Sequence, residues 1–156
     1  MAGSGIPQLK VDGTDLEITI VASRWHDTVM NGLIEGAKKA VEAAGGKWKL
    51  VRVAGSLELP LGAQAAIGAG ADAVVALGVV IRGDTPHFDY VCQGATVGLT
   101  EVSLKTGIPI GFGVLTVDTE EQALARAGLP GSAEDKGAEA AEAAIDLVRT
   151  MQQLAR

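Results

Sequence analysis

One histidine stands where an apolar run gives way to a polar turn. Residues 73–81 read AVVALGVVI, and a Val-rich run without polar side chains is typical of a strand buried on both faces of a parallel sheet. A turn is predicted over 82–86 with Thr85 as the helix N-cap, and His87 falls in the first turn of the helix. Ligands of open α/β sheets bind beyond the carboxyl ends of strands, so this imidazole could exchange protons with a substrate. The alternative is a structural histidine at the surface.

Two further strand ends are expected to meet the same edge of the sheet. Trp25 and His26 follow an apolar strand predicted over 16–22. An indole in a polar loop could stack on a heteroaromatic ligand, worth roughly 0.5–1.5 kcal/mol beyond area burial, or could cap the end of the sheet. The loop after a strand over 48–53 contributes three residues: Ser56, Leu57 and Glu58. Its free backbone groups before a helix could bind a pyrimidine edge, or the loop could be an ordinary connection.

Two cations in the last third of the chain suit an anion site. Arg126 ends a short predicted helix that Thr119 should cap, and Lys136 lies in the first turn of the last predicted helix. A guanidinium matches phosphate through its planar fork, and a helix N-terminus adds N–H donors. The alternatives are pairing of Arg126 with a helix C-terminus and a solvated face for Lys136. Phosphate-loop, dinucleotide and serine-hydrolase motifs are absent, and no covalent nucleophile is apparent.

Strand-like and helix-like patterns alternate along the whole chain, which predicts the framework for these residues. Alternation of this kind implies right-handed crossovers and one mostly parallel sheet covered by helices on both faces. The fold class is therefore α/β, a three-layer sandwich with a flavodoxin-like four-stranded sheet. The strands are expected at 16–22, 48–53, 73–81 and 108–116, with an edge strand at 8–12. The helices are expected from Asp27 or Thr28 to Gly45, and at 59–69, 86–105, 120–127 and 135–154.

Composition narrows the classes of protein. A chain of 156 residues with 47% hydrophobic and 21% charged residues suits one globular domain over 1–156, with an extended N-terminal segment at 1–13. A net charge of −6 argues against nucleic acid or an anionic membrane as a partner. Cys92 is the only cysteine, and with two histidines no metal-ligand spacing occurs. No signal peptide is apparent, which predicts a soluble, cytoplasmic protein.

Taken in order, the motifs resemble the 6,7-dimethyl-8-ribityllumazine synthase family over nearly the whole chain. The most specific segments are GVVIRGDTPHFDYV at 78–91 and TEEQALARAG at 119–128. The resemblance implies condensation of 5-amino-6-(D-ribitylamino)uracil with 3,4-dihydroxy-2-butanone 4-phosphate, the penultimate step of riboflavin biosynthesis. It implies no metal and no redox cofactor. Two alternatives stay open: a paralogous riboflavin synthase of similar fold that binds two lumazine molecules, and a non-catalytic flavin-binding or shell-forming protein.

The resemblance also implies a role for each candidate residue. His87 would transfer protons, and Trp25 would stack on the uracil ring. Six residues would bind the ring or ribityl chain or line their pocket: Ser56, Leu57, Glu58, Val79, Val80 and Ile81. Asp84 and Thr85 would form the turn that holds the phosphate of the four-carbon substrate. Three residues would come from a neighbouring subunit: Phe112, Arg126 and Lys136.

The last prediction concerns the oligomeric state. The resemblance implies a homo-oligomer with active sites between subunits, either a pentamer or a shell of about sixty chains. The shell-forming members resemble one another in a short Gly- and Asn-containing turn between the two C-terminal helices. Here the connection at 129–135 reads LPGSAED, which is longer and carries a proline and two acids. Together with charge repulsion between pentamers, this predicts a free pentamer.

Overall fold

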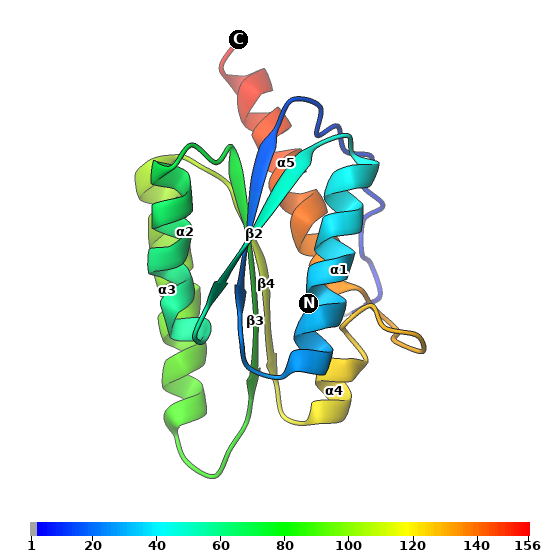
Figure 1. The fold of residues 1–156 in the computed structure, drawn as a ribbon, viewed down its shortest axis with the longest axis vertical. Helices are drawn as coiled ribbons and strands as arrows, with labels where there is room; N and C mark the ends of the chain where they lie inside the picture. Colours follow the sequence, from blue (N-terminus) through cyan, green and yellow to red (C-terminus); the bar gives the residue numbers. More distant parts are fainter. Residues whose placement is uncertain (1–2) are drawn as a thin grey trace.

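The computed structural model describes residues 3–156 and contains one four-stranded parallel sheet between two layers of helices (Figure 1). The strands run in the order β2-β1-β3-β4, and every neighbouring pair is parallel. Their bounds are β1 Glu17–Ser23, β2 Lys47–Val53, β3 Ala73–Ile81 and β4 Ile110–Val117. The predicted α/β three-layer sandwich with a flavodoxin-like sheet is confirmed.

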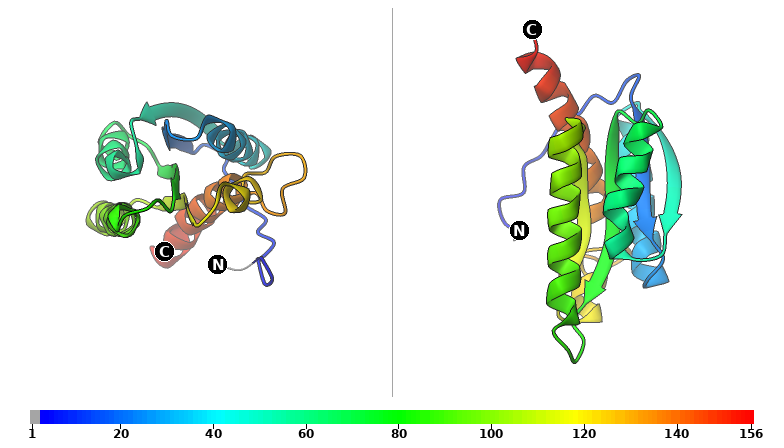
Figure 2. Two further views of the ribbon diagram at one scale, coloured as in Figure 1. Left: turned by 90° about the horizontal axis from the view of Figure 1, so that it is seen from below. Right: turned by 90° about the vertical axis from the view of Figure 1, so that its left-hand side faces the viewer.

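Four long helices cover the two faces of the sheet, as Figures 1 and 2 show. α1 (Asp27–Ala43) and α5 (Lys136–Leu154) pack together on one face. α2 (Leu59–Gly68) and α3 (His87–Thr106) pack together on the other. A 3₁₀ turn, η1 (Ser56–Glu58), precedes α2, and the short α4 (Glu120–Leu124) follows β4. Within residues 3–156, none of the helices combines the length and the apolar composition that crossing a membrane requires.

The composition of β3 explains its central position. Successive side chains of a strand point to opposite faces, so a strand covered on both sides must be apolar at every position. Ala73, Val75 and Leu77 pack with α1 and α5, whereas Val74 and Ala76 pack with α2 and α3. The run without polar side chains is therefore the strand that joins the two halves of the core, and its carboxyl end carries the turn to His87.

The N-terminal segment does not form the strand expected at 8–12. Residues 6–13 have no regular secondary structure and reach no strand edge, and Met1 and Ala2 lie outside the described residues. The end of the segment is held by α5 instead, because Arg149 donates from Nε to the Asp12 carbonyl and from Nη2 to the Thr14 carbonyl, both at 2.7 Å. Backbone groups that a strand would pair within the sheet are thus bound by a side chain.

Two predicted helix caps are also wrong. Neither Asp27 nor Thr28 caps α1, because the helix begins at Asp27 and the N-cap position is taken by His26. Thr85 is not the N-cap of α3, since that helix begins at His87 and its N-cap is the preceding proline. The Thr85 hydroxyl still accepts from the His87 N–H, at a long 3.4 Å. α1 therefore begins next to His26 and α3 begins at His87, and both histidines line the cavity described below.

Candidate active site

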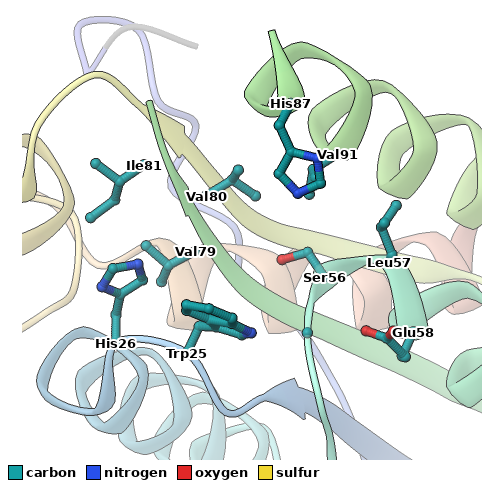
Figure 3. Close-up of a pocket in the computed structure, with 11 residues that line it drawn as sticks. Trp25, His26, Ser56, Leu57, Glu58, Val79, Val80, Ile81, His87 and Val91 are labelled. Atoms are coloured by element: carbon teal, nitrogen blue, oxygen red, sulfur yellow. The ribbon is translucent and has the colours of Figure 1, made fainter. Parts of the chain in front are cut away.

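A cavity of about 260 Å³ opens at the carboxyl edge of the sheet, where the exits of β1, β2 and β3 meet the first turns of α3 (Figure 3). Its lining residues are Trp25, His26, Gly55, Ser56, Leu57, Glu58, Val79, Val80, Ile81, His87 and Val91. Eight of the predicted site residues are therefore brought together by one chain: His87, Trp25, Ser56, Leu57, Glu58, Val79, Val80 and Ile81.

The exit of β1 places two rings against the cavity. The Trp25 side chain is 65% exposed, although large apolar residues are normally covered. The His26 ring lies beside it, with 6.3 Å between the ring centroids and a tilt of 46°. A ring that stays this open at the mouth of a pocket offers a planar surface for a heteroaromatic ligand.

His26 was not among the predicted site residues, and its backbone is unusual. Its φ of 61° and ψ of 70° lie in the left-handed region, which few residues other than glycine adopt. The reversed backbone turns the chain from β1 into α1, and the His26 carbonyl accepts the Met30 N–H of the first helical turn at 2.9 Å. The sequence feature that could have identified His26 as a site residue is its position next to Trp25, as a second imidazole after the same strand.

The loop after β2 approaches β3 closely because Gly78 has no side chain. A Cβ on Gly78 would lie 2.7 Å from the Ser56 hydroxyl oxygen, closer than a real Cβ contact allows. Ser56 is consequently buried, with 6% of its surface exposed. Leu57 is half exposed and lies on the α3 side of the cavity, while Glu58 presents a carboxylate at one end (Figure 3).

The cavity is therefore lined from two sides, with the apolar end of β3 between them. Val79 and Val80 are buried side chains of β3 that run between the walls, continued by Ile81. In Figure 3, Trp25 and His26 lie on one side of this strand and His87 lies on the other. A flat ligand held against the valines would have an imidazole within the same enclosure, so the geometry suits proton transfer to and from a bound ring.

The remaining predicted residues do not line this cavity. Asp84 and Thr85 belong to the exposed turn directly before His87, beyond the end of β3. Phe112 lies on β4 and is 46% exposed. Arg126 follows α4, where its Nη1 donates to the Gln122 carbonyl at 2.8 Å. Within one chain, these side chains are separate from the pocket.

Lys136 is held by carboxylates at the start of α5. Its Nζ lies 2.9 Å from Glu134 Oε2 and 2.7 Å from Glu139 Oε2. Burial lowers the pKa of Lys136, but the hydrogen bonds to Glu139 and Glu134 outweigh burial and raise it above its ordinary value. The ammonium therefore stays charged, and in the isolated chain its charge is matched by two acids.

The fold and the pocket define a flavodoxin-like α/β protein with a small-molecule site at the carboxyl edge of its sheet. The family follows from comparison with known proteins. Residues 15–152 match the 6,7-dimethyl-8-ribityllumazine synthase family, and this chain belongs to that family.

Known proteins with that name are similar to this chain over almost their full length. The 6,7-dimethyl-8-ribityllumazine synthase of Leifsonia xyli subsp. xyli is 61% identical, covering 93% of each chain. That of Clavibacter sepedonicus is 60% identical, over 93% of this chain and 92% of its own. That of Streptomyces coelicolor is 58% identical, over 97% of this chain and 95% of its own. The predicted family is thus confirmed.

Proposed function

We propose that this protein condenses 5-amino-6-(D-ribitylamino)uracil with 3,4-dihydroxy-2-butanone 4-phosphate to give 6,7-dimethyl-8-ribityllumazine, phosphate and water. This is the penultimate step of riboflavin biosynthesis, and membership of the family supports it. The single structural observation that carries the proposal is the shared cavity of His87 and Trp25, which face it from opposite sides of β3. A proton-transfer group and a stacking surface are what the condensation requires.

The reaction does not require a nucleophile from the protein. The nucleophile is the 5-amino group of the pyrimidine, which forms an imine with the ketone carbonyl and releases water. Phosphate then leaves to give an enol that becomes a ketone. Attack of the ribityl-bearing nitrogen on this carbonyl closes the ring with loss of a second water. Each step moves protons, and His87 is the residue proposed to accept and return them, which typically contributes about 10²–10⁴-fold in rate. Holding two reactive substrates in register supplies the other large contribution.

The other lining residues divide between ring and chain. Trp25 is proposed to stack on the uracil ring, with the valines of β3 against its edge. Ser56, Leu57 and Glu58 are proposed to bind the ring and the ribityl hydroxyls through their backbone groups and the Glu58 carboxylate. A polar chain then lies along the η1 loop while the flat ring occupies the apolar part of the cavity, in keeping with the character of each wall.

The phosphate end of the site is proposed to be completed by a second subunit. Asp84 and Thr85 provide the turn, while Phe112, Arg126 and Lys136 come from the neighbour, with Arg126 binding the phosphate. The 46% exposure of Phe112 fits this arrangement, as does the finding that Phe112, Arg126 and Lys136 do not line the cavity of their own chain. The proposed assembly is a free homopentamer with five such sites in the cytoplasm, without nucleic acid or membrane partners.

Incubation of the purified protein with both substrates tests the reaction, because lumazine formation can be followed by fluorescence. Wild type should form product, and His87→Ala should lower kcat by about one to two orders of magnitude, since substrate orientation survives the loss of the imidazole. Wild type that forms no lumazine would refute the proposal. Conversion of added lumazine to riboflavin would indicate the paralogous synthase, and tight flavin binding without turnover would indicate a binding protein.

A further inference from the structure

Arg82 joins the exits of two neighbouring strands without lining the cavity. It directly follows β3, and its N–H donates to the Val117 carbonyl at the end of β4 at 2.9 Å. Its Nε donates to Asp118 Oδ1 at 2.8 Å, one residue beyond β4. Backbone and side chain therefore anchor Arg82 to the edge of the sheet at two points.

The same guanidinium covers the first turn of α3. Arg82 Cζ lies 4.3 Å from the centroid of the Phe88 ring, a cation–π contact. Its Nη1 lies 3.8 Å from Asp89 Oδ1. Phe88 and Asp89 are the two residues that directly follow His87, so the group anchored on Asp118 also contacts the turn that carries the imidazole.

Other attachments of that turn are the long hydrogen bond from the His87 N–H to the Thr85 hydroxyl and the packing of Phe88 against the core. α3 has no side-chain hydrogen bond at its N-cap, and residues 82–87 are all exposed. The loop into α3 also extends beyond the ends of the strands (Figure 2). The Arg82 guanidinium adds a polar connection between this first turn and the end of β4. That connection can set the distance between His87 and the Trp25 side of the cavity.

We propose that Arg82 is a positioning residue that sets the His87 imidazole against the substrate by joining the first turn of α3 to Asp118. The proposal rests on the proposed function, because it takes His87 as the proton-transfer residue. Exposed ion pairs contribute little to folding, so Arg82 has little effect on overall stability. Its effect is on geometry, where a displacement of about 1 Å can cost up to roughly 10²-fold in rate.

Steady-state kinetics of Arg82→Ala and Asp118→Ala test the proposal. Each variant should lower kcat by about 5- to 20-fold, with both KM values within about twofold of wild type and Tm nearly unchanged. The double variant should resemble the singles, because either substitution already breaks the same connection. Arg82→Lys, which can reach Asp118 but lacks the planar group over Phe88, should fall between wild type and Arg82→Ala.

Lys38→Ala is the matched control. Lys38 also combines an ion pair, 3.2 Å to Glu35, with a cation–π contact, 4.6 Å to the Trp48 ring centroid. It lies in the second half of α1 and does not line the cavity. Its kcat should equal that of wild type. An equal fall in kcat for Lys38→Ala and Arg82→Ala would overturn the proposal, because it would reflect loss of any surface contact.

Three further outcomes would overturn it. They are an unchanged kcat in Arg82→Ala, additive losses in the double variant, and a raised KM for the phosphate substrate alone, which would make Arg82 a phosphate ligand. Wild type without lumazine synthesis would refute the proposed reaction instead. Amide hydrogen exchange would then test the connection itself: exchange at 87–91 should be faster in Arg82→Ala than in wild type, and unchanged exchange would refute the connection.

Discussion

His26 is, with Asp15, one of two non-glycine residues that have a positive φ in the described part of the chain. A non-glycine residue in the left-handed region costs about 1–2 kcal/mol, and such residues persist where the surrounding structure imposes them, often at functional sites. Here the imposed turn places an imidazole beside Trp25 in the cavity lining. The strain and the pocket therefore coincide at one position, and this makes stability and activity separable by substitution.

His26→Gly should leave stability unchanged or raise it by up to about 1 kcal/mol, because glycine adopts a positive φ readily. The same substitution should lower kcat/KM by roughly 2- to 10-fold, the equivalent of one lost hydrogen bond to substrate. Urea unfolding and the lumazine assay measure the two effects. His26→Asn is the control, since asparagine tolerates this backbone and retains a polar group. Reduced stability with full activity would assign His26 a purely structural role.

At the scale of elements, the correct predictions are those for which the local sequence strongly favours one structure. A Val-rich run such as 73–81, without polar side chains, is typical of a strand covered on both faces, and β3 has that position. Parallel strands then bring their exits to one edge, which is why Trp25, Ser56 and His87 meet. The Thr119 cap was equally determined, and its hydroxyl accepts the Gln122 N–H at 3.2 Å.

The elements that were mispredicted depend on contacts between distant parts of the chain. A strand at 8–12 was compatible with the local sequence, but Arg149, far along the chain, binds the carbonyl of Asp12. The cap of α1 was assigned to the usual side chains, while the backbone turn at His26 replaced them. The connection from Arg82 to Asp118 is also invisible to local patterns, because it needs the β3-β4 pairing to exist first.

Glu142 on α5 yields a stability prediction with a definite sign. Burial raises the pKa of Glu142 above its ordinary value near 4.5, and the negative charges of Glu139 and Asp135 add to the effect. An acid whose pKa is higher in the folded state destabilises the fold once it is ionised. This penalty is absent below the unfolded pKa, grows as pH rises toward the folded pKa, and is complete above it.

Glu142→Gln should therefore raise the free energy of unfolding at pH 8, by at most about 0.5 kcal/mol because the side chain is only partly covered. The gain should disappear at pH 4. Urea unfolding at the two pH values measures it. Glu35→Gln is the control, because Glu35 pairs with Lys38 at 3.2 Å and its replacement should bring no gain at pH 8. A gain for Glu142→Gln that is equal at both pH values would contradict the electrostatic explanation.

For the whole molecule, the proposed site divides into a part that one chain assembles and a part that it does not. The connection at 129–135 lies between Arg126 and Lys136, both proposed for the second part, and carries the acid of the Glu134–Lys136 pair. With −6 charges per chain, contacts between the proposed pentamers would face repulsion at low salt. Size exclusion coupled to light scattering should give a mass near five chains, about 80 kDa from 15.9 kDa each. A particle of about sixty chains would contradict the free pentamer.

Subunit mixing tests whether the site crosses an interface. His87→Ala and Arg126→Ala chains, each weakly active alone, are co-expressed in equal amounts and purified as mixed oligomers. A site that takes His87 from one subunit and Arg126 from the next is intact in about one arrangement in four, so mixing should restore roughly a quarter of wild-type activity. The control pairs His87→Ala with the double variant, which leaves every site defective and should restore nothing. Activity equal to the average of the two single variants would place both residues in a site within one chain.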